Sequence, residues 1–435
     1  MAPQDRLTAI PRRMAIGRVT VILLIVESTR TIQRRTVATL AGTQVLGGVG
    51  VSAGLAVGSL LAADLSGSET WAGLGGTSQV LGGALAAMIL ARVMAAKGRR
   101  PGLRLGYLIA GTGALVVLLG TLIESFAVFL VGTLFFGGAT AANLQARFAA
   151  TDLAEPGARG RHLSIVVWAT TIGSVVGPNL TGPGAAVARA LGVPVLTGPF
   201  LFSFVGFVLA ALVLTFFLRP DPLLTARDLT AAQNGPDHVE GAPTSGLASI
   251  LAHRTALAAV TAMALGHTVM VTVMVMTPLH MRHGHADLEI IGVVISIHIV
   301  GMFALSPVTG WAVDRWGGPV VVVAGSVIQL TACLLAAASP AGHSTSLTIA
   351  LFLLGLGWSC TLIAGSTMLT AALPLAERPA AQGVGDVAMG LAGGGGGALA
   401  GVVVEAWGYP TLALVAAVLA VAIGLVLPVL RPRDC

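Results

Sequence analysis

Residues 219–246 read RPDPLLTARDLTAAQNGPDHVEGAPTSG, the longest polar stretch in an otherwise unusually apolar chain. Only 10% of the 435 residues are charged, whereas about 25% is usual in a soluble globular domain. The mean hydropathy is +0.90, and long apolar runs lie on both sides of the stretch, from Thr36 to Leu218 and from Leu251 to Leu430. The sequence therefore predicts an all-α, polytopic membrane protein that this polar stretch divides into two parts.

Breaks at Gly, Pro and charged clusters give twelve apolar runs, each long enough to cross a bilayer core of about 30 Å as a helix of about 20 residues. The first six cover residues 36–62, 71–94, 103–122, 126–148, 162–187 and 197–218, and the last six cover 251–278, 289–312, 319–338, 346–371, 382–404 and 410–430. The runs are too long and continuous for the strands of a membrane barrel. The predicted organisation is a loose or interfacial cytoplasmic tail, a first six-helix unit, a central cytoplasmic loop and a second six-helix unit, at residues 1–35, 36–218, 219–250 and 251–431.

Basic residues set the predicted orientation, because short cytoplasmic loops retain Lys and Arg. With the amino terminus inside the cell, all 24 Lys and Arg residues fall at inner ends except Arg189 and Arg282. Both termini are therefore predicted to be cytoplasmic, in a plasma (inner) membrane. Arg greatly outnumbers Lys and Ala, Gly and Val abound, which suggests a bacterial genome rich in G and C. The positive balance reflects this inner rim, so no nucleic-acid partner is expected.

The two predicted units carry short stretches that correspond in position. The second span is followed by ARVMAAKGRR at residues 91–100, and the eighth span is followed by GWAVDRWGGP at residues 310–319. Spans four and ten both end before Leu-Ala-Glu, at residues 153–155 and 375–377. Matches at the same place in each unit indicate an internal repeat, which is common in transporters built from two related halves.

These stretches resemble the major facilitator superfamily, over essentially residues 36–431. The signature of that family between spans two and three is Gly-x-x-x-Asp-Arg/Lys-x-Gly-Arg/Lys-Arg/Lys. The first copy lacks its first Gly and its Asp, and the second lacks the trailing basic pair; the matching residues are Gly98, Arg99 and Arg100, and Gly310, Asp314, Arg315 and Gly317. The resemblance implies two pseudo-symmetric six-helix bundles that rock about a central site.

The fifth span is similar to a glycine-proline motif of the drug:proton antiporters within that superfamily. The matching residues are Gly173, Gly177, Pro178 and Gly182. Glycine lets helices approach closely and proline bends a helix. Ser164 and Thr181 stand where the motif has further glycines, and Arg147 lies nearer the inner end than the motif's usual arginine. The resemblance favours efflux over uptake.

The resemblance also implies that spans one, four, seven and ten line a central cavity. Their polar residues are the candidates for substrate binding: Gln44, Asn143, Gln145, His267, Ser366 and Thr367. A polar group that faced lipid without a partner would cost several kcal/mol, so these side chains are expected to point inward. The alternative is that they form hydrogen bonds between helices.

Ionisable residues within spans are candidates for proton coupling, because an ionised group at mid-membrane costs roughly 2.5–3.5 kcal/mol. Asp386 is the only acid placed well inside a span, and His267 and His298 lie near mid-depth. Histidine titrates near neutral pH and can carry a proton. The alternative for His298 is a packing role.

Charged residues at the inner ends are candidates for a gate of ion pairs that opens when the halves rock. They are Arg99, Arg100, Arg147, Asp152, Asp314 and Arg315, with Glu155, Arg159 and Arg161 nearby. The alternative is solvated loop charge that only sets the orientation.

Three histidines, His280, His283 and His285, are predicted in the outer loop after span seven, beside Asp287 and Glu289. Half of the twelve methionines lie in the same region. Imidazole and thioether groups suit copper or zinc, whereas methionine also suits a greasy cavity that accepts varied ligands. The spacing matches no known metal-site signature, and the greasy cavity is the favoured interpretation.

The function predicted is secondary active transport by alternating access, with proton-coupled efflux of apolar or amphipathic small molecules by a monomer. No phosphate-binding Gly-x-x-x-x-Gly-Lys-Ser/Thr loop is present, so an ion or substrate gradient must supply the energy, and no cofactor or resident metal is expected. An uptake permease or a metal-ion exporter is the alternative. A membrane-embedded enzyme or a channel is less favoured, because neither a clustered catalytic set nor a selectivity filter is recognisable.

Overall fold

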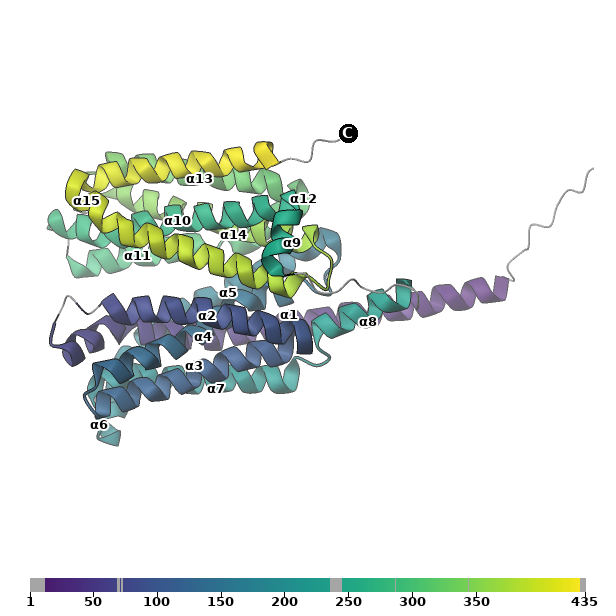
Figure 1. The fold of residues 1–435 in the computed structure, drawn as a ribbon, viewed down its shortest axis with the longest axis horizontal. Helices are drawn as coiled ribbons and strands as arrows, with labels where there is room; N and C mark the ends of the chain where they lie inside the picture. The colour runs from purple at the N-terminus through teal and green to yellow at the C-terminus, as the bar shows by residue number, and fades with distance from the viewer. Residues whose placement is uncertain are drawn as a thin grey trace, which may run out of the picture.

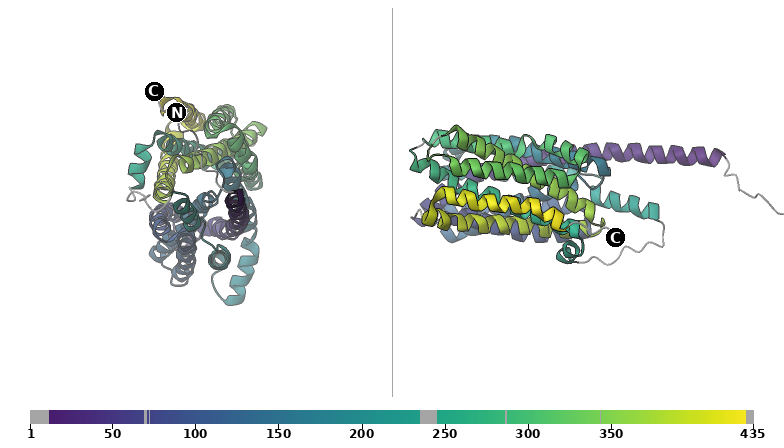
Figure 2. Two further views of the ribbon diagram at one scale, coloured as in Figure 1. Left: turned by 90° about the vertical axis from the view of Figure 1, so that its right-hand side faces the viewer. Right: turned by 90° about the horizontal axis from the view of Figure 1, so that it is seen from above.

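The computed structural model describes residues 12–68, 71, 73–234, 245–285, 287–342 and 344–430. Within the helices, the side chains of residues 12–28, 233–234, 288–289 and 426–430 are not described. The described chain is almost entirely helical. Figure 1 shows the helices lying side by side along one direction in two bodies, and the left panel of Figure 2 looks along them.

The first body is formed by seven α-helices that precede the central polar stretch. They are α1 (Arg12–Ser66), α2 (Gly73–Lys97), α3 (Arg99–Leu122), α4 (Phe126–Ala149), α5 (Arg159–Asn179), α6 (Thr181–Leu191) and α7 (Gly198–Phe217), with short 3₁₀ turns at Pro156–Ala158 and Val195–Thr197. The side chain of Ser125 accepts a hydrogen bond from the backbone N–H of Val128 and so caps the start of α4.

The second body is formed by the helices after the polar stretch. They are α10 (Arg254–His283), α11 (Leu288–Phe303), α12 (Ser306–Trp316), α13 (Gly318–Ala338), α14 (Thr345–Ala372) and α15 (Arg378–Leu430). Two shorter helices, α8 (Pro222–Asn234) and α9 (Gly246–Ala252), join the bodies. The predicted central loop at 219–250 is therefore partly helical.

Twelve crossings can be counted in the described residues, as the sequence predicts. Ten helices are long and apolar enough to cross a membrane, and the α5–α6 pair, bent by 52°, makes an eleventh crossing. That count includes α15 as a single helix. Gly408, with φ 81° and ψ 166°, however breaks α15 into two helices. Figure 1 shows these two parts of α15 lying antiparallel. The twelfth crossing follows from that break.

The structure differs from the predicted elements in two places. Residues 12–35 of the predicted loose or interfacial tail are helical, because α1 begins at Arg12, and its first turns project beyond the bundle (Figure 1); residues 1–11 lie outside the described residues. His280 and His283 lie in the last turn of α10, not in a loop, and His285 follows two residues after the helix ends. Gly17 and Pro278 lie within these helical stretches and do not end them.

The two bodies have separate hydrophobic cores and the same internal packing. One core is built from residues between Val37 and Leu218, and the other from residues between Ile250 and Ile423 joined by a few side chains of α4 and α5. In the first body α3 packs on α4 and α1 on α5; correspondingly, α13 packs on α14 and α10 on α15. Gly98 and Gly317 form equivalent turns with φ of 91° and 85°, a conformation that favours glycine. The sequence repeat thus corresponds to a repeat in the fold.

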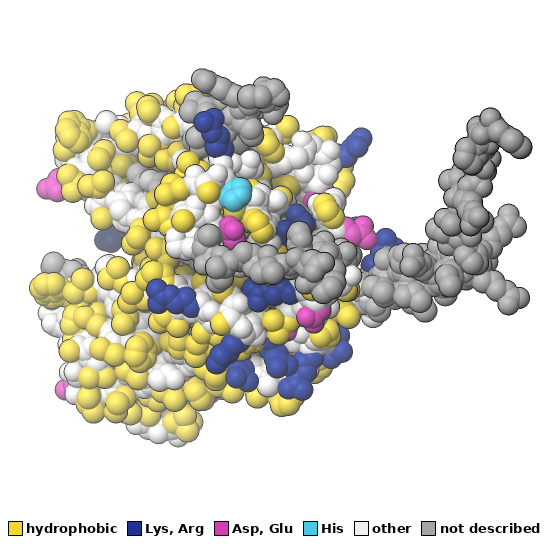
Figure 3. Space-filling model, turned by 45° about the vertical axis from the view of Figure 1, so that its right-hand side comes forward, with side chains coloured by type: hydrophobic (Ala, Val, Ile, Leu, Met, Phe, Trp, Pro, Cys, Tyr) yellow, Lys and Arg dark blue, Asp and Glu magenta, His cyan; other side chains and the backbone are white. Residues whose placement is uncertain are grey.

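Large apolar side chains cover the sides of the bundle, as expected for a surface that contacts lipid. Val418 is 70% exposed and Trp407 is 67% exposed. Figure 3 shows hydrophobic side chains over both bodies, with Lys and Arg gathered toward the end from which α8 projects. We call this end, where α3 begins and α4 ends, the inner end, because the sequence predicts that it is cytoplasmic; the opposite end is the outer end.

Candidate functional site

A buried ion pair joins the two bodies. Arg147, near the end of α4, donates from Nη2 to Oδ1 of Asp386 in α15 at 2.6 Å. Asp386 lies eight residues after the start of α15, or about 12 Å along the helix. The two side chains are 1% and 2% exposed. We call this group, with its neighbours Gln145 and Ser366, the Asp386 cluster.

Both charges of the Asp386 cluster have additional partners. Gln145 donates from Nε2 to the second carboxylate oxygen of Asp386 at 2.7 Å. Arg147 donates from Nε to the hydroxyl of Ser366 at 3.0 Å, and from Nη1 to the carbonyl of Leu144. Burying two ions is costly unless the geometry is good and the remaining polar atoms are satisfied. Four of the residues predicted separately for substrate, proton and gate therefore form one hydrogen-bonded unit between the bodies.

A second buried pair lies close to the inner end. Arg99, at the first residue of α3, donates to both carboxylate oxygens of Asp152 at 2.8 and 3.1 Å, and both side chains are fully buried. The same guanidinium donates to Oε1 of Gln382 in α15 at 2.8 Å, and Gln382 in turn donates to Thr370. This Arg99 cluster, like the first, connects the first body to α15.

The third contact between the bodies involves the start of α5. Asp314, near the end of α12, accepts from the backbone N–H groups of Gly160 and Arg161, both at 2.8 Å. An acid at a helix N-terminus satisfies free N–H groups and the helix dipole. A Cβ at Gly160 would lie 2.6 Å from the carbonyl oxygen of Gly310, so glycine permits this approach. The gate residues Arg100 and Arg315 do not take part through their side chains: the backbone N–H of Arg100 binds Asp221, and Arg315 is exposed.

The other predicted substrate residues lie within the individual bodies. Gln44 donates to the hydroxyl of Thr170 on α5, and Asn143 accepts from Tyr107 at 2.7 Å. Thr367 bonds to the carbonyl of Ile363 in its own helix. His267 accepts at Nδ1 from the indole N–H of Trp358 at 2.9 Å, and Phe303 packs edge-on against the same indole. Asn143 and His267 are only partly buried, which leaves them the most accessible of the set.

His298 is placed differently from the other proton-coupling candidates. It is 1% exposed, and its Nδ1 lies 2.7 Å from the carbonyl oxygen of Leu351 on α14. This contact is internal to the second body, so the geometry favours the packing role for His298.

The glycine-proline residues hold α5 against α1. A Cβ at Gly173 would meet backbone atoms of Gly48 at 2.7 Å, and one at Gly177 would meet Ser52. Pro178 lies within α5, one residue before its end, and α6 departs at 52° after Leu180. Gly182 has no neighbour within 4 Å of its Cβ position. The motif therefore gives close packing and a bend, and only its last glycine makes no contact.

No group of three or more His, Cys, Asp or Glu side chains that could hold a metal occurs in the part of the chain that the structure describes. His280 is instead stacked on the ring of Tyr409, with ring centroids 4.1 Å apart. This packing gives no support to a metal site formed by the three histidines.

Sequence reasoning missed two residues at the inner end, Gln382 in the interface between the bodies and Asp221 at the start of α8. Gln382 precedes Asp386 by four residues, and residues so spaced share a helix face, so Gln382 was recognisable as its neighbour. Asp221 accepts from the backbone N–H of Leu223 at 3.0 Å and caps α8. An Asp followed by Pro at the first helical position is a known start signal, so α8 was also recognisable.

Comparison with known proteins identifies the family. The chain matches the Major Facilitator Superfamily over residues 39–287 and 260–434. It is 39% identical over 394 residues to the uncharacterized MFS-type transporter YdeG of Bacillus subtilis (strain 168), covering 90% of this chain and 91% of that protein. It is 31% identical over 368 residues to the riboflavin transporter RfnT of Brucella anthropi, covering 82% and 86%.

The fold agrees with solved structures of the same superfamily. FucP, a superfamily transporter of E. coli, matches with a TM-score of 0.71 at 17% identity, over 91% of this chain and 98% of that chain. The clusters between the two bodies therefore lie in a transporter and not in an enzyme. The chain belongs to the Major Facilitator Superfamily of multi-pass membrane transporters.

Proposed function

We propose that this transporter exports apolar or amphipathic small molecules in exchange for protons, by alternating access. The observation that carries the proposal is the Asp386–Arg147 ion pair, which is buried and joins the two bodies. A proton taken up by Asp386 removes the negative charge and leaves Arg147 without its counter-ion. The contact between the bodies is then weakened, so protonation and rocking are linked.

The surroundings of the partly buried polar residues support an apolar or aromatic substrate. In the second body, His267 lies beside Trp358, whose indole packs against Phe303. In the first body, Asn143 lies beside Tyr107, which packs near Phe207. One polar group among aromatic rings suits a molecule that has a flat apolar part and few charges.

One observation supports the direction of transport, and another suggests which substrates to test. The glycine-proline segment that packs α5 on α1 resembles that of drug antiporters, which favours efflux. RfnT is named a riboflavin transporter, so riboflavin belongs in the test panel together with aromatic dyes and drugs.

The proposal is tested in membrane vesicles of both orientations, with a pH gradient imposed and each compound of the panel added. Everted vesicles with an acidic lumen should accumulate at least one compound, and a proton ionophore or omission of the protein should abolish the accumulation. Accumulation only in right-side-out vesicles with an acidic exterior would show uptake and contradict efflux. Flux that ignores the gradient in both orientations would contradict proton coupling.

A further inference from the structure

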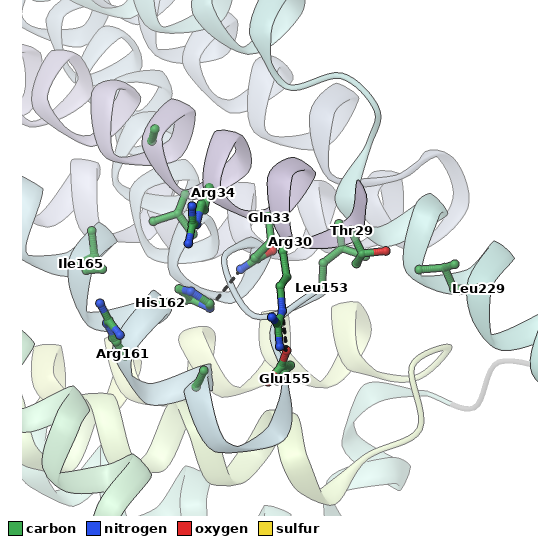
Figure 4. A pocket seen from close by; sticks show the side chains of 13 residues that line it. Thr29, Arg30, Gln33, Arg34, Leu153, Glu155, Arg161, His162, Ile165 and Leu229 are labelled. Atoms are coloured by element: carbon green, nitrogen blue, oxygen red, sulfur yellow. Dashed lines mark hydrogen bonds and ion pairs between the residues drawn. The ribbon is translucent and has the colours of Figure 1, made fainter. Parts of the chain in front are cut away.

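A basic pocket lies at the inner end between α1, α5 and α8, beside the contact of Arg161 with Asp314. Its volume is about 690 Å³. Figure 4 shows its side chains, which come from α1, from the segment before α5, from α5 and from α8. It is lined by Thr29, Arg30, Gln33, Arg34, Val37, Ala38, Leu153, Glu155, Ala158, Arg161, His162, Ile165 and Leu229.

The polar side of the basic pocket carries more positive than negative charge. Arg30, Arg34 and Arg161 line it, and Glu155 is the acid among the described lining side chains. Glu155 forms an ion pair with Arg30, with 3.0 Å between Oε1 of Glu155 and Nη2 of Arg30 (Figure 4). Asp314 accepts from the backbone of Arg161, so that contact does not use the guanidinium. Arg34 and Arg161 are exposed and can meet an anion from two sides of the pocket.

The remaining wall of the basic pocket is apolar. Val37 and Ala38 of α1 line this part of the pocket together with Ile165 of α5, whereas Leu229 of α8 lies at the opposite end, toward Thr29 (Figure 4). Arg34 also lies two residues before Thr36, where the sequence becomes apolar. The pocket therefore lies where a membrane surface meets the hydrocarbon core, with its charges toward water and its apolar wall toward lipid.

We propose that the basic pocket binds an anionic phospholipid of the inner leaflet. The phosphodiester lies between Arg34 and Arg161, and the first methylenes of an acyl chain cover Val37, Ala38 and Ile165. Guanidinium groups bind phosphate oxygens with strong, charge-assisted hydrogen bonds, and basic pockets at the cytoplasmic surface suit anionic headgroups. Free phosphate would use the arginines but leave the apolar wall uncovered, so a lipid matches the pocket better.

The test uses the purified full-length protein in a neutral detergent, with thermal unfolding as the readout of binding. The probes are dioctanoyl phosphatidylglycerol, dioctanoyl phosphatidylcholine and inorganic phosphate. The pocket variant is Arg34→Gln with Arg161→Gln. A matched variant, Arg35→Gln with Arg104→Gln, removes the same charge from exposed residues that do not line the pocket. Arg34→Lys with Arg161→Lys keeps the charge.

Phosphatidylglycerol should raise the unfolding temperature of the native protein, of the matched variant and of the lysine variant. In the pocket variant, the concentration needed should rise by about tenfold or more, because two cationic contacts are lost. Equal responses of the pocket and matched variants would overturn the site. An equal response to phosphatidylcholine would overturn the charge selectivity, and an equal response to inorganic phosphate would overturn the lipid assignment.

Discussion

Asp386→Asn is expected to abolish proton-driven accumulation of substrate. Each unit of imposed pH difference is worth about 1.4 kcal/mol per proton, which is tenfold in concentration. The native protein should therefore accumulate substrate up to about tenfold per pH unit for each coupled proton, whereas Asp386→Asn should reach a concentration ratio of about one. The reason is that asparagine keeps the shape of the carboxylate contact with Gln145 and Arg147 but cannot take up the proton.

The controls for this prediction separate coupling from folding. Asp64→Asn changes an exposed acid at the outer end of α1 and should transport as the native protein does. Asp386→Asn with Arg147→Gln removes both buried charges and should also lack coupling, without an uncompensated arginine. Exchange of substrate without a gradient should persist in the variants. Gradient-driven accumulation at the native level in Asp386→Asn would remove this residue from the coupling mechanism.

Arg99→Gln is expected to be the most destabilising of the substitutions at the inner end. It leaves the carboxylate of Asp152 fully buried without its cation and frees Oε1 of Gln382. Breaking a buried ion pair by removing one partner typically costs about 3–5 kcal/mol. The unfolding temperature of the purified protein should fall strongly, and expression in the membrane should fall with it.

A second substitution at the same pair shows whether the buried charge is the cause. Arg99→Gln with Asp152→Asn should recover most of the loss, because no unpaired ion remains. Arg100→Gln, at the neighbouring residue whose contact with Asp221 uses its backbone, should change stability by no more than about 0.5 kcal/mol. Native-like unfolding of Arg99→Gln would contradict the role given to the Arg99 cluster.

Much of the fold could be predicted from the sequence, because lipid allows few solutions. Apolar run length fixes the number of crossings, and the matching turns at Gly98 and Gly317 fix the repeat. The places where a crossing helix is bent or broken were harder to predict from the sequence. Pro178 predicts a bend in the fifth span, but the angle of that bend also depends on how α5 packs against Gly48 and Ser52. The break between α11 and α12 lies before Pro307, and no other proline precedes it in the predicted eighth span.

The candidate site was only partly predictable. Asp386 could be found because an acid inside a span is unusual, and Arg147 because it ends span four. Their pairing could not, because 239 residues separate them and a single sequence carries no record of such contacts. For the same reason Arg99 and Asp152 could both be named for the gate, but not as partners of one another.

Rocking of the two bodies is tested most directly by the distances between them at both ends. Spin labels are placed at Lys97 and Pro374 for the inner end, and at Asp64 and Arg282 for the outer end, after the native cysteines are replaced by serine. All four residues are exposed.

As the pH is lowered and Asp386 takes up its proton, we expect a longer inner distance together with a shorter outer distance. In Asp386→Asn the same shifted distribution should be present at every pH. Distances at both ends that stay fixed across pH and in the variant would contradict rocking of two bodies governed by the Asp386 cluster.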